Sequence, residues 1–217
     1  MPTRQVSEWK DGFLFIGNHL ALDFVNTRPV RNGEPTELLP DFAALLRWFQ
    51  AAGLLSSSQV SKLHEEWKKS SRARQTLKNL RKLREELRAE VVARESGKTA
   101  GPRMIASLNR LMSRHPMLTR LKAAGRKYQT ELWFEQRQPE DLFAPLAHSA
   151  AVLLTDTDRS RLRKCAHCVL HFYDTSKKGT RRWCSMNLCG NRLKVAAYAD
   201  RRRLHSHSED KPRKLPF

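Results

Sequence analysis

The chain has 217 residues, of which 40% are hydrophobic, and this is enough for one sizeable core and a second, smaller module. Its 41 lysines and arginines exceed its 22 aspartates and glutamates, so the formal charge is +19 and favours a polyanionic partner, nucleic acid above all. An anionic membrane would attract the same charge, but no apolar run approaches the roughly 20 residues of a spanning helix, so we expect no membrane protein.

The first residues bear on the compartment. Residues 1–12 are polar and lack the apolar stretch of a secretory signal, so we expect a flexible N-terminus and a cytoplasmic protein, nucleoid-associated if its partner is DNA. Because thiols stay reduced in the cytoplasm, the four cysteines favour metal binding over two disulfides.

Helices dominate the predicted elements that follow. Residues 13–16 are apolar and predict a short strand, and a short helix follows between residues 19 and 27. Residues 128–134 are rich in aromatics and predict a second strand. Apolar residues at helical spacing, with capping residues ahead of them, predict further helices over residues 42–52, 57–96, 102–115 and 142–154.

The positive charge is concentrated near the C-terminus. Residues 1–158 carry a net charge of +7, whereas residues 159–217 carry +12. Residues 205–217 have the composition of a basic disordered tail. We therefore predict a mainly α protein with small β elements (α+β), in which a helical domain over residues 13–156 precedes a small zinc finger over residues 160–204.

The finger is predicted from two cysteine pairs. Cys165 and Cys168 form a C-x2-C pair, Cys184 and Cys189 form a C-x4-C pair, and 15 residues separate them. Four thiolates fill a tetrahedral coordination sphere and leave no position for water, so the spacing predicts one structural Zn²⁺. Four buried free thiols, an iron–sulfur cluster, or His167 or His171 in place of one cysteine are the alternatives.

A basic surface is predicted beside these cysteines. Residues 169–174 read as a strand, 176–180 as a turn and 181–183 as the return strand, so the order is knuckle, hairpin, second ligand pair and helix. The helix, over residues 192–204, has one packing side and one basic side; a merely solvated helix is the alternative. The candidate nucleic-acid contacts are Lys177, Lys178, Arg181, Arg182, Arg192, Lys194, Tyr198, Arg201, Arg202 and Arg203.

The finger also carries a family resemblance, in the segments Asp174-Thr175-Ser176, Arg181-Arg182-Trp183-Cys184-Ser185-Met186 and Cys189-Gly190-Asn191-Arg192. Together they resemble the CGNR zinc finger family. Upstream, the segment from Gly17 to Thr27, with Trp48 and Ala52-Gly53-Leu54-Leu55, resembles the ABATE domain that usually precedes that finger, although Asn18 stands where a second glycine is expected. The resemblance implies a bacterial, stress-induced transcription regulator whose four cysteines bind zinc and whose finger contacts DNA.

The leading function is therefore a zinc-dependent, DNA-binding transcription regulator with a regulatory or ligand-sensing N-terminal domain. An RNA- or ribosome-associated zinc-finger protein, and a zinc-stabilised module that binds an acidic protein, are the alternatives. No nucleophile with a paired base is visible, so we expect no enzyme. His19, Asp23 and Asn26 are candidates for the pocket of a small-molecule effector. A helix cap is the alternative for Asn26, and a satisfied surface or turn residue is the alternative for Asp23. A homodimer would suit paired DNA half-sites.

Overall fold

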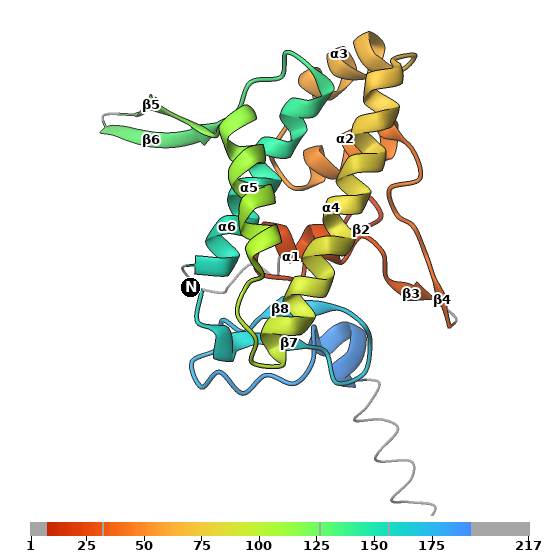
Figure 1. Cartoon of the computed structure of the whole chain (residues 1–217), viewed down its shortest axis with the longest axis vertical. Coiled ribbons are helices and arrows are strands. Elements are labelled where there is room, and N and C mark those ends of the chain that lie inside the picture. Colours follow the sequence, from red (N-terminus) through yellow and green to blue (C-terminus); the bar gives the residue numbers. More distant parts are fainter. Residues whose placement is uncertain (1–7, 32, 126, 156, 192–217) are drawn as a thin grey trace, which may run out of the picture.

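The computed structural model describes residues 8–31, 33–125, 127–155 and 157–191, and in them a helical bundle stands on a small C-terminal finger (Figure 1). The mainly α class with small β elements is confirmed. The α-helices are α1 (Leu20–Val25), α2 (Phe42–Ala51), α3 (Ser57–Trp67), α4 (Ser71–Glu95), α5 (Pro102–Arg114) and α6 (Phe143–Thr155). Shorter helical turns lie at Pro139–Leu142 (η1), Arg159–Arg161 (η2) and Met186–Gly190 (η3).

The described strands form four antiparallel pairs. Three of these pairs are ribbons of only two or three residues per strand, whereas the β5–β6 ribbon has seven in each strand and projects from the bundle (Figure 1). The pairs are β1 (Trp9–Lys10) with β2 (Phe13–Leu14), β3 (Val30–Arg31) with β4 (Glu34–Pro35), β5 (Leu118–Ala124) with β6 (Lys127–Trp133), and β7 (Leu162–Lys164) with β8 (His171–Tyr173).

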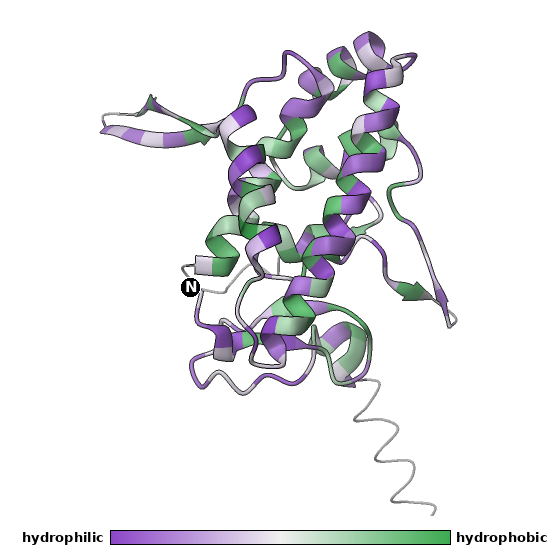
Figure 2. Ribbon diagram, viewed as in Figure 1, coloured by the Kyte–Doolittle hydropathy of each residue, from purple (hydrophilic) through white to green (hydrophobic). Residues whose placement is uncertain are grey.

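The bundle core is built from the apolar faces of α1, α2, α4 and α6. Trp48 on α2 is fully buried, and its ring lies 5.6 Å from that of Phe24 and 5.4 Å from that of Phe49. Buried hydrophobic residues of these helices belong to one cluster, and hydrophobic positions are coloured green on the ribbon (Figure 2). No helix in the described part of the chain is long and apolar enough to cross a membrane.

The prediction of one helix over residues 57–96 is wrong, because the helix is interrupted between α3 and α4. Ser70 has extended backbone angles, and its hydroxyl accepts a hydrogen bond from the N–H of Ala73 (3.3 Å), as an N-cap does. The cap starts a new helix in a different direction. The helical spacing of Leu63, Trp67 and Leu77 concealed the break, since both helices bury their apolar faces in the same core.

The pairing of the finger's strands also differs from the prediction. The segment 181–183 was expected to return against residues 169–174, but β8 pairs with the preceding β7, with Leu162 opposite Tyr173. The C-x2-C turn reverses the chain between these strands. The segment after β8 is held by side chains instead of by a strand ladder.

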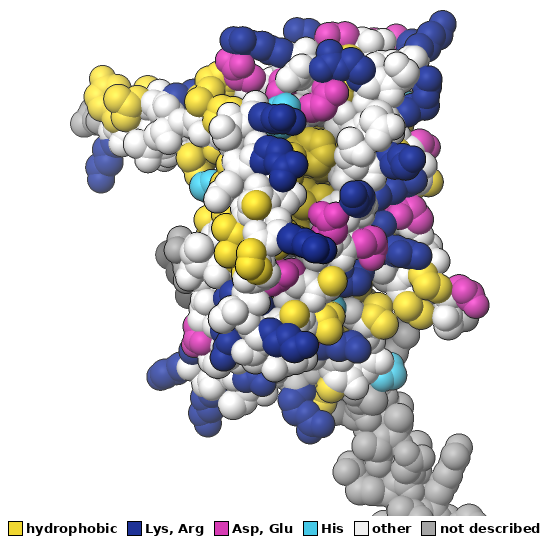
Figure 3. Space-filling model, viewed as in Figure 1, with side chains coloured by type: hydrophobic (Ala, Val, Ile, Leu, Met, Phe, Trp, Pro, Cys, Tyr) yellow, Lys and Arg dark blue, Asp and Glu magenta, His cyan; other side chains and the backbone are white. Residues whose placement is uncertain are grey.

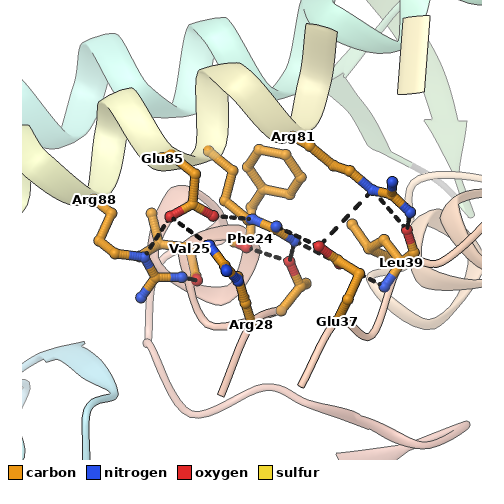
Figure 4. Close-up of polar contacts among 10 residues, drawn as sticks. Phe24, Val25, Arg28, Glu37, Leu39, Arg81, Glu85 and Arg88 are labelled. Carbon is orange, nitrogen blue, oxygen red and sulfur yellow. Dashed lines mark hydrogen bonds and ion pairs between the residues drawn. The ribbon is translucent and has the colours of Figure 1, made fainter. Parts of the chain in front are cut away.

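A buried ionic network fixes α1 and the loop after it against α4 (Figure 4). Arg84 is 1% exposed and donates to both carboxylate oxygens of Glu37 (2.7 and 2.5 Å) and to the hydroxyl of Thr27 (3.0 Å). Burial would raise the pKa of Glu37, but its bonds to Arg84 outweigh this and hold that pKa below its ordinary value. One turn along α4, Arg88 donates to the carbonyl of Val25 (2.5 Å). The end of α1 therefore has a fixed position.

Candidate metal centre

The first two cysteines lie in the turn between β7 and β8. The N–H of Cys165 donates to the carbonyl of Leu170 (2.9 Å), which closes the turn around Cys168. The N–H of Ala166 donates to the carbonyl of Arg182 (2.9 Å). This second bond holds the segment that leads to the other cysteine pair alongside the turn.

Of the second pair, Cys184 precedes the helical turn η3 and Cys189 lies within it. Ser185 caps this turn, since its hydroxyl accepts the N–H groups of Asn187 (3.0 Å) and Leu188 (3.2 Å). A five-residue spacing within a capped turn points both thiols to the same side. The sequence therefore reaches the same geometry at both pairs by two different turns.

The four sulfur atoms converge on one point. All lie within 4.8 Å of one another, with 3.7 Å between the sulfurs of Cys168 and Cys184 and 3.6 Å between those of Cys184 and Cys189. Tetrahedral zinc with Zn–S bonds of about 2.3 Å places its sulfurs about 3.8 Å apart, whereas a disulfide needs about 2.05 Å. The residues thus fit one tetrahedral ion, and the four cysteines are free of disulfides.

The crowded sulfurs perturb one another's ionisation. Hydrogen bonds from Cys168 and Cys184 lower the pKa of Cys165. The hydrogen bond between Cys168 and Cys165 in turn raises the pKa of Cys168 to about 12. The contacts with Cys165 and Cys168 also raise the pKa of Cys184. Four like charges at these distances cannot coexist without a cation, and a divalent metal supplies the compensating charge.

Family models match almost the whole described chain. Residues 18–157 match the model of the ABATE domain, whose description is "Putative stress-induced transcription regulator". The chain belongs to the ABATE family. Residues 161–202 match the CGNR zinc finger model, which agrees with the four converging sulfurs on a site for one structural Zn²⁺. A comparison with curated proteins found no match.

In this ABATE protein a buried carboxylate organises the loop between the two cysteine pairs. Asp174 is fully buried and accepts the N–H groups of Ser176 (2.9 Å) and Arg181 (2.8 Å). Burial would raise the pKa of Asp174, but these bonds lower it below its ordinary value. From β7 and the turn before it, Arg161 donates to the carbonyl of Ser176 (2.8 Å) and Arg163 to that of Gly179 (2.7 Å). Nothing in the local sequence distinguishes Arg161 and Arg163 from other basic residues, so their positioning role was not predicted.

The predicted nucleic-acid residues fall into three groups. Lys177, Lys178 and Arg182 are exposed on this loop. The guanidinium of Arg181 instead donates to the carbonyls of Trp183 (2.7 Å) and Cys184 and lies 4.7 Å from the centre of the Phe172 ring, so it is used within the finger. The others lie outside the described residues: Arg192, Lys194, Tyr198, Arg201, Arg202 and Arg203.

The three residues proposed to line an effector pocket make separate contacts. The Asp23 carboxylate accepts the N–H of Gly17 (2.7 Å), and burial raises the pKa of Asp23 to about 7. His19 lies 3.2 Å from the hydroxyl of Ser149, and burial lowers the pKa of His19. Asn26 contacts the finger. Each of the three side chains therefore has its own hydrogen-bond partner: the backbone of Gly17, the hydroxyl of Ser149 and the backbone of His171.

The finger shares its core with the start of the chain. Leu14 and Ile16, at and after β2, pack in the same apolar cluster as Phe172 and three of the four cysteines. In return, Leu162 of β7 packs in the core of the helical bundle. Asn18, whose φ of +54° explains why a glycine is expected there, donates from its side chain to the carbonyl of Tyr173 (2.9 Å). The two parts are docked along a continuous interface.

Proposed function

We propose that this ABATE protein is a zinc-dependent, DNA-binding transcription regulator in which the finger contacts DNA and the helical domain controls the finger. The observation that carries the proposal is the convergence of Cys165, Cys168, Cys184 and Cys189 within 4.8 Å, next to a strongly basic segment. A bound zinc ion supplies the cross-link that holds both cysteine turns in place. The zinc ion is proposed to be structural and not catalytic, since four thiolates fill its coordination sphere.

The charge of the finger supports a phosphate partner. Residues 159–217 carry a net charge of +12, in which the loop residues Lys177, Lys178 and Arg182 are exposed. Asp174 and the arginines of β7 and η2 hold that loop, so its cations have a fixed place relative to the metal. In the proposal Arg181 positions the loop, and the basic residues of 192–203 add the remaining contacts.

The docked interface supports the proposed control by the helical domain. The finger is joined to α1 through Asn26 and to α4 through the partly buried pair formed by His171 and Glu95 (2.8 Å). A ligand or partner that moved α1 or α4 would therefore move β8, which ends the first cysteine turn. The pocket of His19, Asp23 and Asn26 stays a proposal, as do the domain limits 13–156 and 160–204.

Binding to duplex DNA tests the proposal. We expect fluorescence anisotropy with the zinc-loaded full chain to show binding whose affinity falls steeply with salt, by about 0.9 in the logarithmic slope per phosphate contact. A triple variant, Lys177→Ala with Lys178→Ala and Arg182→Ala, should lower that slope by about 2 to 3 and weaken binding on every sequence. Affinity that is independent of salt would overturn the proposal.

A matched variant separates the loop from charge in general. Lys62, Lys69 and Lys78 are exposed on or between α3 and α4, and α3 lies at the opposite end of the molecule from the finger (Figure 1). Replacing all three with alanine removes the same charge and should leave the slope unchanged. Tighter binding to single-stranded RNA than to duplex DNA would favour the RNA-associated alternative and contradict the proposal.

A further inference from the structure

The β5–β6 ribbon stands apart from the rest of the molecule. Each strand has seven residues, paired in register from Leu118 opposite Trp133 to Ala124 opposite Lys127. The ribbon projects from the bundle at the end of α5 (Figure 1). The second strand was predicted, but the first was missed, because Leu118, Leu121 and the cations Arg120 and Lys122 do not alternate as apolar and polar residues. An isolated two-stranded ribbon is marginally stable in water, so a partner that covers one of its faces would stabilise it.

The register divides the ribbon into two chemically different faces. Residues opposite one another share a face, and faces alternate along each strand. One face carries Arg120, Lys122 and Glu131, with the two cations 3.0 and 3.5 Å from the carboxylate. The other, which we call the uncharged face, consists of Thr119, Leu121, Ala123, Tyr128, Thr130 and Leu132.

The uncharged face is open to solvent. Leu121 is 73% exposed, Tyr128 is 81% exposed and Leu132 is 54% exposed, although each is a large apolar or aromatic residue. Hydrophobic side chains gather on the outer part of the ribbon in the space-filling view (Figure 3). Adjacent exposed residues of this kind mark a surface that another molecule covers, because burying them is favourable by roughly 25 cal/mol per Å².

The distribution of charge indicates which kind of partner the uncharged face suits. A two-fold symmetric contact places a patch against itself, so a patch with charges of one sign repels its own copy. With a net charge of +19 the chain repels its copies in general, whereas this face carries no charge at all. A nucleic acid would be drawn to cations instead, and those of the ribbon's described residues, Arg120, Lys122 and Lys127, all lie on the other face. The uncharged face therefore suits a second copy of this chain.

We propose that two copies of this chain dimerise by packing the uncharged faces of their β5–β6 ribbons against each other across a two-fold axis. Leu121 and Leu132 form the centre of the contact, and Tyr128 covers its outer end. The dimer would hold two fingers at a set separation, but its formation does not depend on DNA binding. A failure of either proposal can therefore be told from a failure of the other.

Sedimentation velocity of the zinc-loaded full chain, over a wide concentration range and without DNA, tests this proposal. We expect a reversible monomer–dimer equilibrium in the wild type. Leu121→Glu and Leu132→Glu each bring two like charges together across the axis and should raise the dissociation constant of the dimer at least tenfold. Tyr128→Lys should also raise the dissociation constant of the dimer, because it places like charges together at the outer end of the contact. Because all three side chains are exposed in the monomer, thermal unfolding of dilute protein should stay unchanged.

Gln129→Glu is the matched control, because Gln129 is exposed on the same strand but lies on the charged face, opposite Lys122. It adds the same charge as the leucine variants and should leave the dimer intact. A wild type that stays monomeric at every concentration would overturn the proposal, and so would a dimer that tolerates all three uncharged-face variants. Lower DNA affinity with unchanged self-association would assign the face to nucleic acid and overturn it too.

Discussion

The side-chain amide of Asn26 hydrogen-bonds to both the N–H and the C=O of His171, at 3.0 and 2.8 Å. Asn26 is 1% exposed and His171 is 2% exposed, so both bonds are shielded from water. The amide offers the edge of β8 the same donor and acceptor that a neighbouring strand would offer. One side chain at the end of α1 thus completes the backbone hydrogen bonding of the finger across the domain interface.

Removal of this amide should weaken the whole molecule. Asn26→Ala leaves a buried N–H and a buried C=O without partners, and each costs about 1–3 kcal/mol, so we expect the free energy of unfolding to fall by about 2–4 kcal/mol. Urea unfolding followed by circular dichroism measures this. Asn79→Ala, at an exposed position of α4, is the comparison and should change stability by less than about 0.5 kcal/mol. Equal losses of stability in the two variants would show that the bonds between Asn26 and His171 contribute no more than an exposed side chain does.

Stability should also depend on pH through Asp23. Burial raises the pKa of Asp23 in the folded state to about 7, so the folded protein binds a proton that the unfolded chain has lost. The stabilisation from this group is therefore complete below the ordinary pKa near 4 and is lost as pH rises through 7. Between pH 5 and 8 the wild type should lose about 2–3 kcal/mol relative to Asp23→Asn.

The comparison with Asp23→Asn is needed because His19 acts in the opposite direction. Burial lowers the pKa of His19, so its contribution to stability is gained as pH rises toward the ordinary value near 6.5. The difference between the two proteins at each pH isolates the carboxyl group. Parallel stability curves for the wild type and Asp23→Asn across this range would contradict the assignment.

Zinc removal should unfold the finger and spare most of the helices. Purified protein should hold one zinc ion per chain, and Cys184→Ser should bind it far more weakly, because the sulfur of Cys184 lies within 3.7 Å of those of Cys168 and Cys189. Far-ultraviolet circular dichroism should change little, since the finger strands β7 and β8 supply only Leu162 and Tyr173 to the buried cluster of the helices. His167→Ala removes an exposed side chain of the turn between Cys165 and Cys168 and should keep full metal content. Loss of zinc from that variant would make the histidine a ligand.

Local patterns were sufficient to predict much of this fold. Capping residues were predicted ahead of the helices, and Asp41 before α2 is one of them, since its carboxylate accepts the N–H of Ala44 (2.7 Å). The cysteine spacing predicted one four-sulfur site, since two tight turns need few distant contacts to orient their thiols. The resemblance over Gly17–Thr27 located the ABATE domain correctly.

Contacts between distant residues were beyond the sequence. Asn26 and His171 are 145 positions apart, and neither residue differs in its local pattern from an ordinary helix cap or strand residue. Arg181 stays a candidate nucleic-acid contact, but the folded loop also bonds its guanidinium to the carbonyl of Trp183 and places it over the ring of Phe172, which its basic neighbours did not indicate. The partner of β8 was mispredicted because pairing depends on which segment the cysteine turn brings close.

The ionic network on α4 offers a further test of what fixes α1. Arg84→Leu leaves Glu37 without its main counter-charge, so we expect a loss of about 3–5 kcal/mol in the free energy of unfolding. Replacing both Arg84 and Glu37 with leucine removes the charge and its partner together, and should cost less than the two single losses added. Lys82→Ala breaks an exposed pair with Glu86 on the same helix and should cost about 0.5 kcal/mol or less. If the losses of the Arg84 and Glu37 variants simply add, the two groups act independently and the network does not hold the loop as a unit.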